Sequence, residues 1–289
     1  MSGVLLGALL LCLVGGTGIL FGLALGVRGA AELVLTGYVL GFAALIALFL
    51  LLSASKDVTQ GTLIGGSAVL FVAAGGTWLL TGGRGLPTFG RTILSEIARH
   101  RALVFLLLAV VLAFAYVGAL DLGTPPNGWD PLNYHLARAA FWLQSRHIGY
   151  IEPTYDERLN LNPPNGEIGS AFVLGVTHDE NLVQFVQFFA ALACAAGVYA
   201  LARRVGLTRA EAAFGGLIFL SLPIVALQAS LAKNDLVVAE IARGLPDQVV
   251  QVHEACAPDV VSQKKQEKRE RKHDRGQQSI LPSPTGQQH

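Results

Sequence analysis

Residues 102–120 read ALVFLLLAVVLAFAYVGAL, an apolar run without a single Asp, Glu, Lys or Arg. A helix needs about 20 consecutive apolar residues to cross the hydrocarbon core of a bilayer, where each backbone amide must be satisfied within the segment. Six charge-free stretches of this kind occur, at residues 4–27, 33–54, 61–83, 102–120, 181–202 and 212–232. The sequence therefore predicts an all-α integral membrane protein with about six transmembrane helices.

The composition of the whole chain agrees with this prediction and excludes several other classes. Hydrophobic residues make up 52% of the chain and charged residues 14%, and the mean hydropathy is +0.51, a balance foreign to ordinary soluble domains. The formal net charge of +1 gives no basic surface for nucleic acid, so we exclude that partner. The three cysteines form no CxxC motif, so neither a disulfide framework nor a zinc site is predicted.

Lys and Arg are unevenly divided between alternate loops, and this division predicts the orientation. One set holds Arg28, then Arg84, Arg91, Arg99 and Arg101, then Arg203, Arg204 and Arg209; the other set holds Lys56, Arg138, Arg146, Arg158 and Lys233. Cytoplasmic loops retain Lys and Arg, so we expect the first set inside the cell. The N-terminus and the long loop of residues 121–180 are then external.

The external loop contains a predicted interfacial helix, which begins at Asp130 and Pro131. Asp130 suits the N-cap position, and Pro131 suits the first helical position because its missing N–H would be unbonded there anyway. The apolar face of this helix, which should lie on the membrane surface, comprises Leu132, Leu136, Ala139, Ala140 and Leu143. The amphipathic pattern of residues 92–101 predicts a second interfacial helix. Residues 168–176 are apolar but too few to span the bilayer, so they predict a re-entrant or interfacial segment.

The composition changes after residue 239, and this change predicts a boundary. Residues 1–239 form the multi-span transmembrane region, whereas residues 240–289 are rich in Gln, Lys, Arg and His. If the spans alternate regularly, the basic run at 264–272 lies outside the cell, against the bias of the other loops. We therefore expect residues 240–289 to be either disordered or translated out of frame.

Three short motifs follow one another at the external side. They are Trp129-Asp130-x-x-x-Tyr134-His135-x-x-Arg138, Asn162-Pro163-Pro164-x-x-Glu167 and Asn234-Asp235-Leu236-Val237-Val238-Ala239. In this order, over residues 102–239, they resemble the GT-C membrane glycosyltransferases, in particular bacterial relatives of protein mannosyltransferases and aminoarabinose transferases. The resemblance implies a multi-pass protein of the bacterial cytoplasmic membrane. It also implies transfer of a sugar from a polyprenyl-phosphate donor to an acceptor on the external face, with inversion at the anomeric carbon.

The same resemblance implies roles for individual residues. Asp130 corresponds to the general base that deprotonates the acceptor, and Arg138 to a group that pairs with the donor phosphate. Glu167 and Asp235 correspond to positioning groups or ligands of a divalent metal, the one cofactor that the resemblance leaves open. Tyr134 and His135 lie in the first motif and are further candidates for substrate binding.

Each of these residues also has a simpler interpretation. Asp130 can be a helix cap, and this is compatible with its role as a base. Glu167 can be an exposed loop carboxylate, and Asp235 can be a charge at the membrane boundary. The histidines of the external loop, including His135, match no zinc spacing, so solvated side chains and no structural metal are expected.

The functional alternatives come from other classes of membrane protein. A lipid or solute transporter subunit should carry charged residues within its spans, and the six stretches have none. A non-catalytic membrane scaffold is the other alternative. GT-C enzymes place the large external loop after the first span and have many more spans, whereas three additional spans precede the loop here. We therefore expect an N-terminal portion of such an enzyme, and a portion can be inactive by itself.

Overall fold

The computed structural model describes residues 3–83, 85, 91–161 and 164–232, and it describes residues 91–94 through their backbone alone. Two compact units divide the chain, residues 1–241 and 242–289, and all described residues belong to the first. The described residues contain helices and no strand. The predicted tail at 240–289 and Asp235 lie outside the described residues.

Among the described residues, five helices are long and apolar enough to cross a membrane, which confirms the predicted fold class. They are α1 (Gly3–Ala24), α2 (Ala30–Ala54), α3 (Gln60–Leu80), α5 (Arg101–Gly123), and η2 (Asn181–Gln184) continued by α9 (Phe185–Arg204). Their bounds lie within about three residues of the predicted stretches, because each stretch ends where charged or turn residues begin. The chain is an all-α, multi-pass membrane protein.

The sixth predicted span consists of two helices with a bend between them. It consists of α10 (Arg209–Ser221) and α11 (Pro223–Ala229), whose axes differ by 65°. Leu222 between them has an extended conformation, with φ −65° and ψ 124°. Proline disfavours the helical conformation of the residue before it and donates no backbone hydrogen bond, so Pro223 ends one helix and begins the next.

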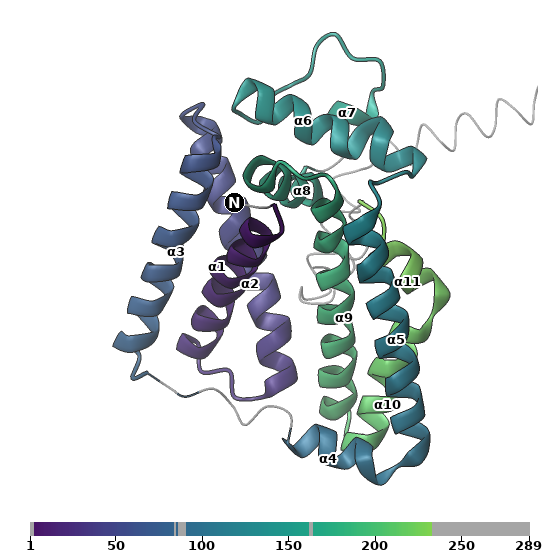
Figure 1. Ribbon diagram of the computed structural model, residues 1–289. Coiled ribbons are helices and arrows are strands. Elements are labelled where there is room, and N and C mark those ends of the chain that lie inside the picture. The colour runs from purple at the N-terminus through teal and green to yellow at the C-terminus, as the bar shows by residue number, and fades with distance from the viewer. Residues whose placement is uncertain (1–2, 84, 86–90, 162–163, 233–289) are drawn as a thin grey trace, which may run out of the picture. The chain divides into compact units, whose positions relative to one another are not determined.

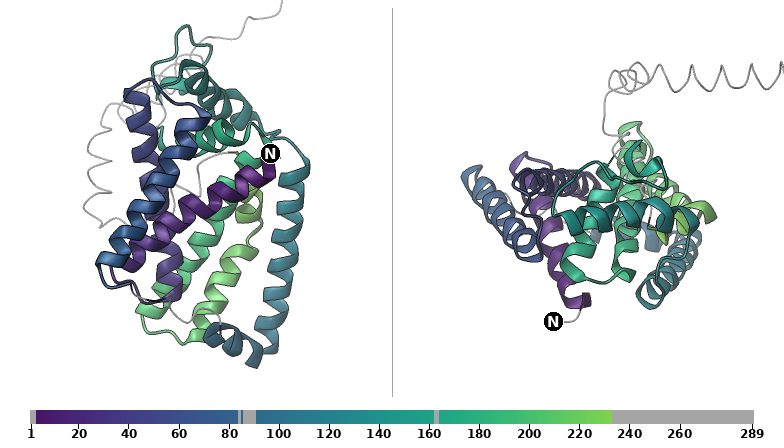
Figure 2. Two further views of the ribbon diagram at one scale, coloured as in Figure 1. Left: turned by 60° about the vertical axis from the view of Figure 1, so that its left-hand side comes forward. Right: turned by 90° about the horizontal axis from the view of Figure 1, so that it is seen from above.

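Helices α1 and α2 make the closest contact among the spans, through glycines. A Cβ atom on Gly18 would overlap the carbonyl oxygen of Gly37, and one on Gly41 would lie 2.7 Å from the carbonyl oxygen of Val14. Only glycine allows the two backbones to approach so closely. This contact fixes the point where α1 crosses α2, and Figure 2 shows α1 running obliquely past its neighbours.

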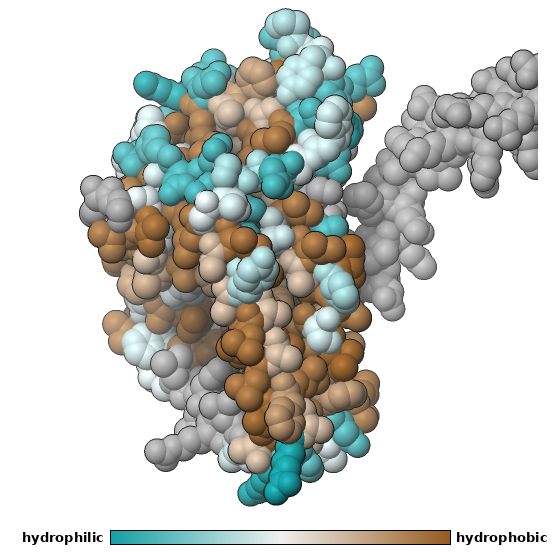
Figure 3. All heavy atoms as spheres, turned by 45° about the vertical axis from the view of Figure 1, so that its right-hand side comes forward, coloured by the Kyte–Doolittle hydropathy of each residue, from teal (hydrophilic) through white to brown (hydrophobic). Residues whose placement is uncertain are grey.

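The helices of the long loop gather at one end of the spans, which we call the loop end. They are η1 (Pro131–His135), α6 (Leu136–Ser145), α7 (Arg158–Leu161) and α8 (Asn165–Thr177). Figure 1 shows α4 (Arg91–Arg99), the predicted second interfacial helix, at the opposite end. On the face in Figure 3, hydrophobic side chains cover the spans and hydrophilic ones gather mainly at the loop end.

Helix α8 corresponds to the predicted segment at 168–176 that is too short to span. It has 13 residues and is largely buried, with Ile168, Phe172 and Val176 in one core cluster with Phe49 and Leu63 of the spans. This helix therefore links the loop end to the transmembrane core. The first turn of α8, which holds Glu167, contacts η1 and α6.

Candidate functional site

The helix that carries Asp130 begins two residues earlier than the sequence predicts. The N–H of Leu132 donates to the carbonyl of Gly128 at 3.2 Å, and Asp130 already has helical angles, φ −64° and ψ −44°. Its carboxylate makes no cap hydrogen bond to the helix that follows, so the prediction of an N-cap was wrong. Pro131 still fits, because the N–H groups of a first helical turn have no partner within the helix.

The next turn is a π-helix, η1, in which the N–H of Leu136 donates to the carbonyl of Pro131. Such turns are rare and occur frequently at functional sites. The buried stripe of η1 and α6 comprises Pro131, His135, Arg138, Ala139 and Trp142, whereas Leu132 of the predicted apolar face is exposed. The side that carries His135 and Arg138 therefore faces the protein core, and of the predicted apolar face only Ala139 belongs to the buried stripe.

Glu167 is the centre of a buried polar cluster formed by η1, α6 and α8. It lies in the first turn of α8, where the helix dipole favours a carboxylate, and its Oε1 lies 2.9 Å from His135 Nδ1 and 3.6 Å from Arg138 Nη1. Its Oε2 accepts no hydrogen bond from any residue that the structure describes. The simpler interpretations, an exposed Glu167 and a solvated His135, were wrong, because α8 packs against the side of η1 and α6 that carries His135 and Arg138.

Arg138 extends this cluster to the segment before α8. Its side chain is 1% exposed, and it donates from Nε to the carbonyl of Leu159 at 2.6 Å and from Nη2 to the carbonyl of Arg158 at 2.5 Å. Burial lowers the pKa of Arg138, and the nearby charge of Glu167 opposes that shift. In this arrangement the guanidinium binds the protein's own backbone, and it would have to leave these carbonyls to contact a donor phosphate.

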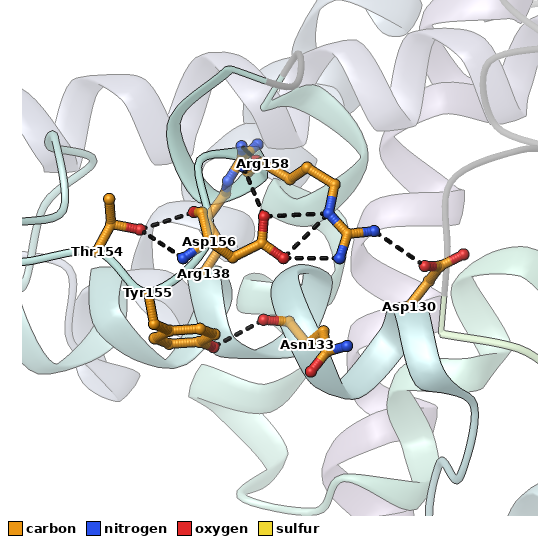
Figure 4. A network of polar contacts seen from close by, with 7 residues as sticks. All are labelled: Asp130, Asn133, Arg138, Thr154, Tyr155, Asp156 and Arg158. Atoms are coloured by element: carbon orange, nitrogen blue, oxygen red, sulfur yellow. Dashed lines mark hydrogen bonds and ion pairs between the residues drawn. The ribbon is translucent and has the colours of Figure 1, made fainter. Parts of the chain in front are cut away.

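A second, solvent-facing cluster surrounds the side chain of Arg158 (Figure 4). Its Nη1 lies 3.3 Å from Asp130 Oδ1 and its Nη2 lies 2.7 Å from Asp156 Oδ2, while its guanidinium carbon lies 4.6 Å from the centre of the Tyr134 ring. The side chains of Arg158 and Asp130 are 42% and 35% exposed. Hydrogen bonds from Arg158 lower the pKa of Asp156, and the same bonds raise the pKa of Arg158.

The loop that carries Arg158 is itself held in place over η1 (Figure 4). The hydroxyl of Tyr155 donates to the carbonyl of Asn133 at 2.7 Å, and the hydroxyl of Thr154 donates to the carbonyl of Asp156 at 2.7 Å. Local hydrogen bonds of this kind reduce the freedom of an exposed loop. The solvent-facing cluster is therefore attached at several points.

The sequence-predicted residues thus fall into two connected groups. Asp130 and Tyr134 belong to the solvent-facing cluster, whereas His135, Arg138 and Glu167 form the buried cluster. The groups meet at Arg158, whose backbone carbonyl binds Arg138 and whose side chain binds Asp130. Sequence reasoning missed Arg158 and Asp156, although both lie in the polar stretch before the two prolines.

This arrangement can orient a carboxylate at the loop end beside a fixed positive charge. Among the described residues, no three His, Cys, Asp or Glu side chains are grouped so that they could hold a metal ion. The pair that the structure places at the solvent-facing side is the carboxylate of Asp130 and the guanidinium of Arg158. No protein-family model, curated protein or solved structure matches this chain.

Proposed function

We propose that this protein is a membrane glycosyltransferase, or the part of one that carries the base, which transfers a sugar from a polyprenyl-phosphate donor to an external acceptor. The observation that carries the proposal is the state of Asp130. Its carboxylate makes no cap hydrogen bond, is partly exposed at the loop end, and is held by Arg158 at 3.3 Å. The order of the three motifs supports the same function.

In the proposed reaction, Asp130 accepts the proton of the acceptor's nucleophilic group. That group forms a bond to the anomeric carbon while the bond between this carbon and the phosphate oxygen breaks. The electron pair of the broken bond leaves with the polyprenyl phosphate. Attack from the side opposite the leaving group inverts the anomeric configuration. A positioned general base of this kind contributes about 100- to 10,000-fold to a rate.

Arg158, in place of Arg138, pairs with the donor phosphate in this proposal. Arg158 is 42% exposed and lies beside Asp130, whereas Arg138 is 1% exposed and bonded to two backbone carbonyls. A guanidinium suits an anionic oxygen because it offers several donors in one plane. The buried cluster then has a positioning role, because Arg138 holds the backbone carbonyl of Arg158 while Glu167 and His135 hold Arg138 in place.

The experiment measures transfer in proteoliposomes supplied with labelled polyprenyl-phosphate sugars and a membrane extract as acceptor. Asp130→Asn keeps the shape of the side chain but removes its basicity, so transfer should fall by about 100-fold or more with unchanged thermal stability. Asp57→Asn is the matched control, since Asp57 is an exposed carboxylate in another loop at the same end. Near-full transfer by the Asp130→Asn variant would remove Asp130 from the mechanism.

One observation favours transport as a second candidate function. Helix α5 continues beyond the predicted stretch to Gly123, so Asp121 lies within a candidate span, where it is 1% exposed. Its Oδ2 accepts no hydrogen bond from the described part of the chain. Ionisable side chains buried in spans often mark pathways for ions or protons.

A further inference from the structure

An apolar groove lies between α1 and α9, with α2 behind it. It has a volume of about 380 Å³ and is lined by residues of α1 and by aromatic side chains that include Phe42, Phe172, Phe185 and Phe189. None of its described lining residues is charged. The groove exists because α1 contacts α2 closely at Gly18 and is separated from α9 on the other side.

The groove begins at the loop end and reaches the middle of the spans. On α1 it extends from Val4, whose neighbour Gly3 lies against Asp179, to Gly15. At a rise of 1.5 Å per residue, this distance is about 16 Å along the helix. Half the hydrocarbon thickness of a bilayer is about 15 Å. The groove is therefore as deep as one leaflet.

Within a membrane, an apolar groove of this kind is filled by hydrocarbon, since water has no hydrogen-bonding partner there. The depth matches an acyl chain of one leaflet, whereas a long polyprenyl chain would extend well past the inner end. The volume is within the range of pockets that enclose small ligands. The shape of the groove thus selects one ordinary acyl chain.

The charges at the opening select the head group. A Cβ on Gly3, the neighbour of the lining residue Val4, would lie 3.0 Å from Asp179 Oδ2, and Glu180 lies two residues before Leu182, which also lines the groove. Carboxylates repel the net negative charge of an anionic phospholipid and attract an ammonium group. A zwitterionic lipid with an amine therefore fits better than an anionic lipid.

We propose that the groove between α1 and α9 binds one acyl chain of a phosphatidylethanolamine molecule from the leaflet on the loop side. The ammonium of the lipid lies near Asp179 and Glu180. This binding does not depend on sugar transfer, and its test uses no enzymatic activity. Failure of one proposal therefore leaves the other intact.

The probe is phosphatidylethanolamine with a photoactivatable diazirine in one acyl chain, in nanodiscs that contain the purified full chain. Cross-linked peptides are identified by mass spectrometry. Adducts should concentrate on residues 4–15 and 182–189, above the level at the exposed positions Val69 and Val72 of α3, which report ordinary surrounding lipid. Phosphatidylglycerol and polyprenyl phosphate with the same label should give fewer groove adducts.

Gly15→Phe should block the groove, because a Cβ at Gly15 meets no heavy atom within 4 Å and its side chain would fill the open space. We expect groove adducts to fall by about tenfold or more. Gly75→Phe is the matched control, since Gly75 is also a half-buried glycine of a span with open space but lies outside the groove.

Asp179→Asn combined with Glu180→Gln tests the head group without changing the groove. This double variant should keep chain labelling and lose the preference for phosphatidylethanolamine over phosphatidylglycerol. Undiminished groove adducts in Gly15→Phe, adducts spread evenly over the exposed helix faces, or stronger groove labelling by polyprenyl phosphate would each overturn the proposal.

Discussion

Replacement of Arg138 by Met tests whether the buried cluster holds the loop end together. The variant removes hydrogen bonds to the carbonyls of Leu159 and Arg158 and leaves Glu167, whose side chain is 0% exposed, without its 3.6 Å cationic partner. Removal of one member of a buried ion pair costs about 3–5 kcal/mol, because the remaining charge is uncompensated. This free-energy loss already includes the two hydrogen bonds, because they belong to the same buried side chain.

The assay is thermal unfolding in detergent micelles, where this loss should lower the melting temperature by roughly 10 °C. The matched control is Arg99→Met, since Arg99 pairs with Glu96 at 3.2 Å with its side chain 72% exposed. An exposed pair contributes less than about 1 kcal/mol. Equal losses in the two variants would refute the reasoning. The double variant Arg138→Met/Glu167→Gln should lose less than the sum of the two single variants, because it removes both charges.

Three further predictions concern the solvent-facing cluster, the buried carboxylate and the orientation. Hydrogen bonds from Arg158 lower the pKa of Asp156 below its ordinary value of 3.8, so their stabilisation is present above that value and is lost as the pH falls through the lower folded-state pKa. Unfolding below about pH 4 should therefore be less pH-dependent in Asp156→Asn than in wild type, and identical profiles would contradict the role of this pair. Asp121→Asn should raise the melting temperature by about 2–4 °C, because it removes the cost of a buried carboxylate, and a decrease would show that the ionised group has a partner. With the native cysteines replaced, Ser145→Cys should be labelled in intact cells and Arg91→Cys spared, and the opposite result would reverse the orientation.

The spans could be predicted from the sequence because membrane insertion depends on a local property, the length of an apolar run. The bend at Pro223 was also readable, since proline disfavours a helical residue before it, but we predicted residues 212–232 only as one transmembrane span. Helix α8 was located because its apolar run was too short to span.

The two clusters could be predicted only in part. The resemblance selected Asp130 and Arg138 as neighbours on one helix, but burial of Arg138 depends on which face of α6 packs against α8. Local periodicity predicted an apolar face that lies on the membrane surface, and it carries no information on the contacts of His135 and Arg138 with α8. The role of Arg158 depends on a loop that folds back over η1, a long-range contact that sequence spacing does not encode.

The π-turn at Pro131–His135 affects how relatives of this chain are to be recognised. A π-turn contains one residue more than an α-turn, and one residue in a helix corresponds to a rotation of about 100°. Seven residues separate Asp130 from Arg138 in this chain. In a homologue whose helix lacks the extra residue, the corresponding carboxylate and guanidinium would take the same positions only if six residues separated them. Search patterns with fixed spacing would miss such a homologue, and alignments should allow a one-residue gap between Pro131 and His135.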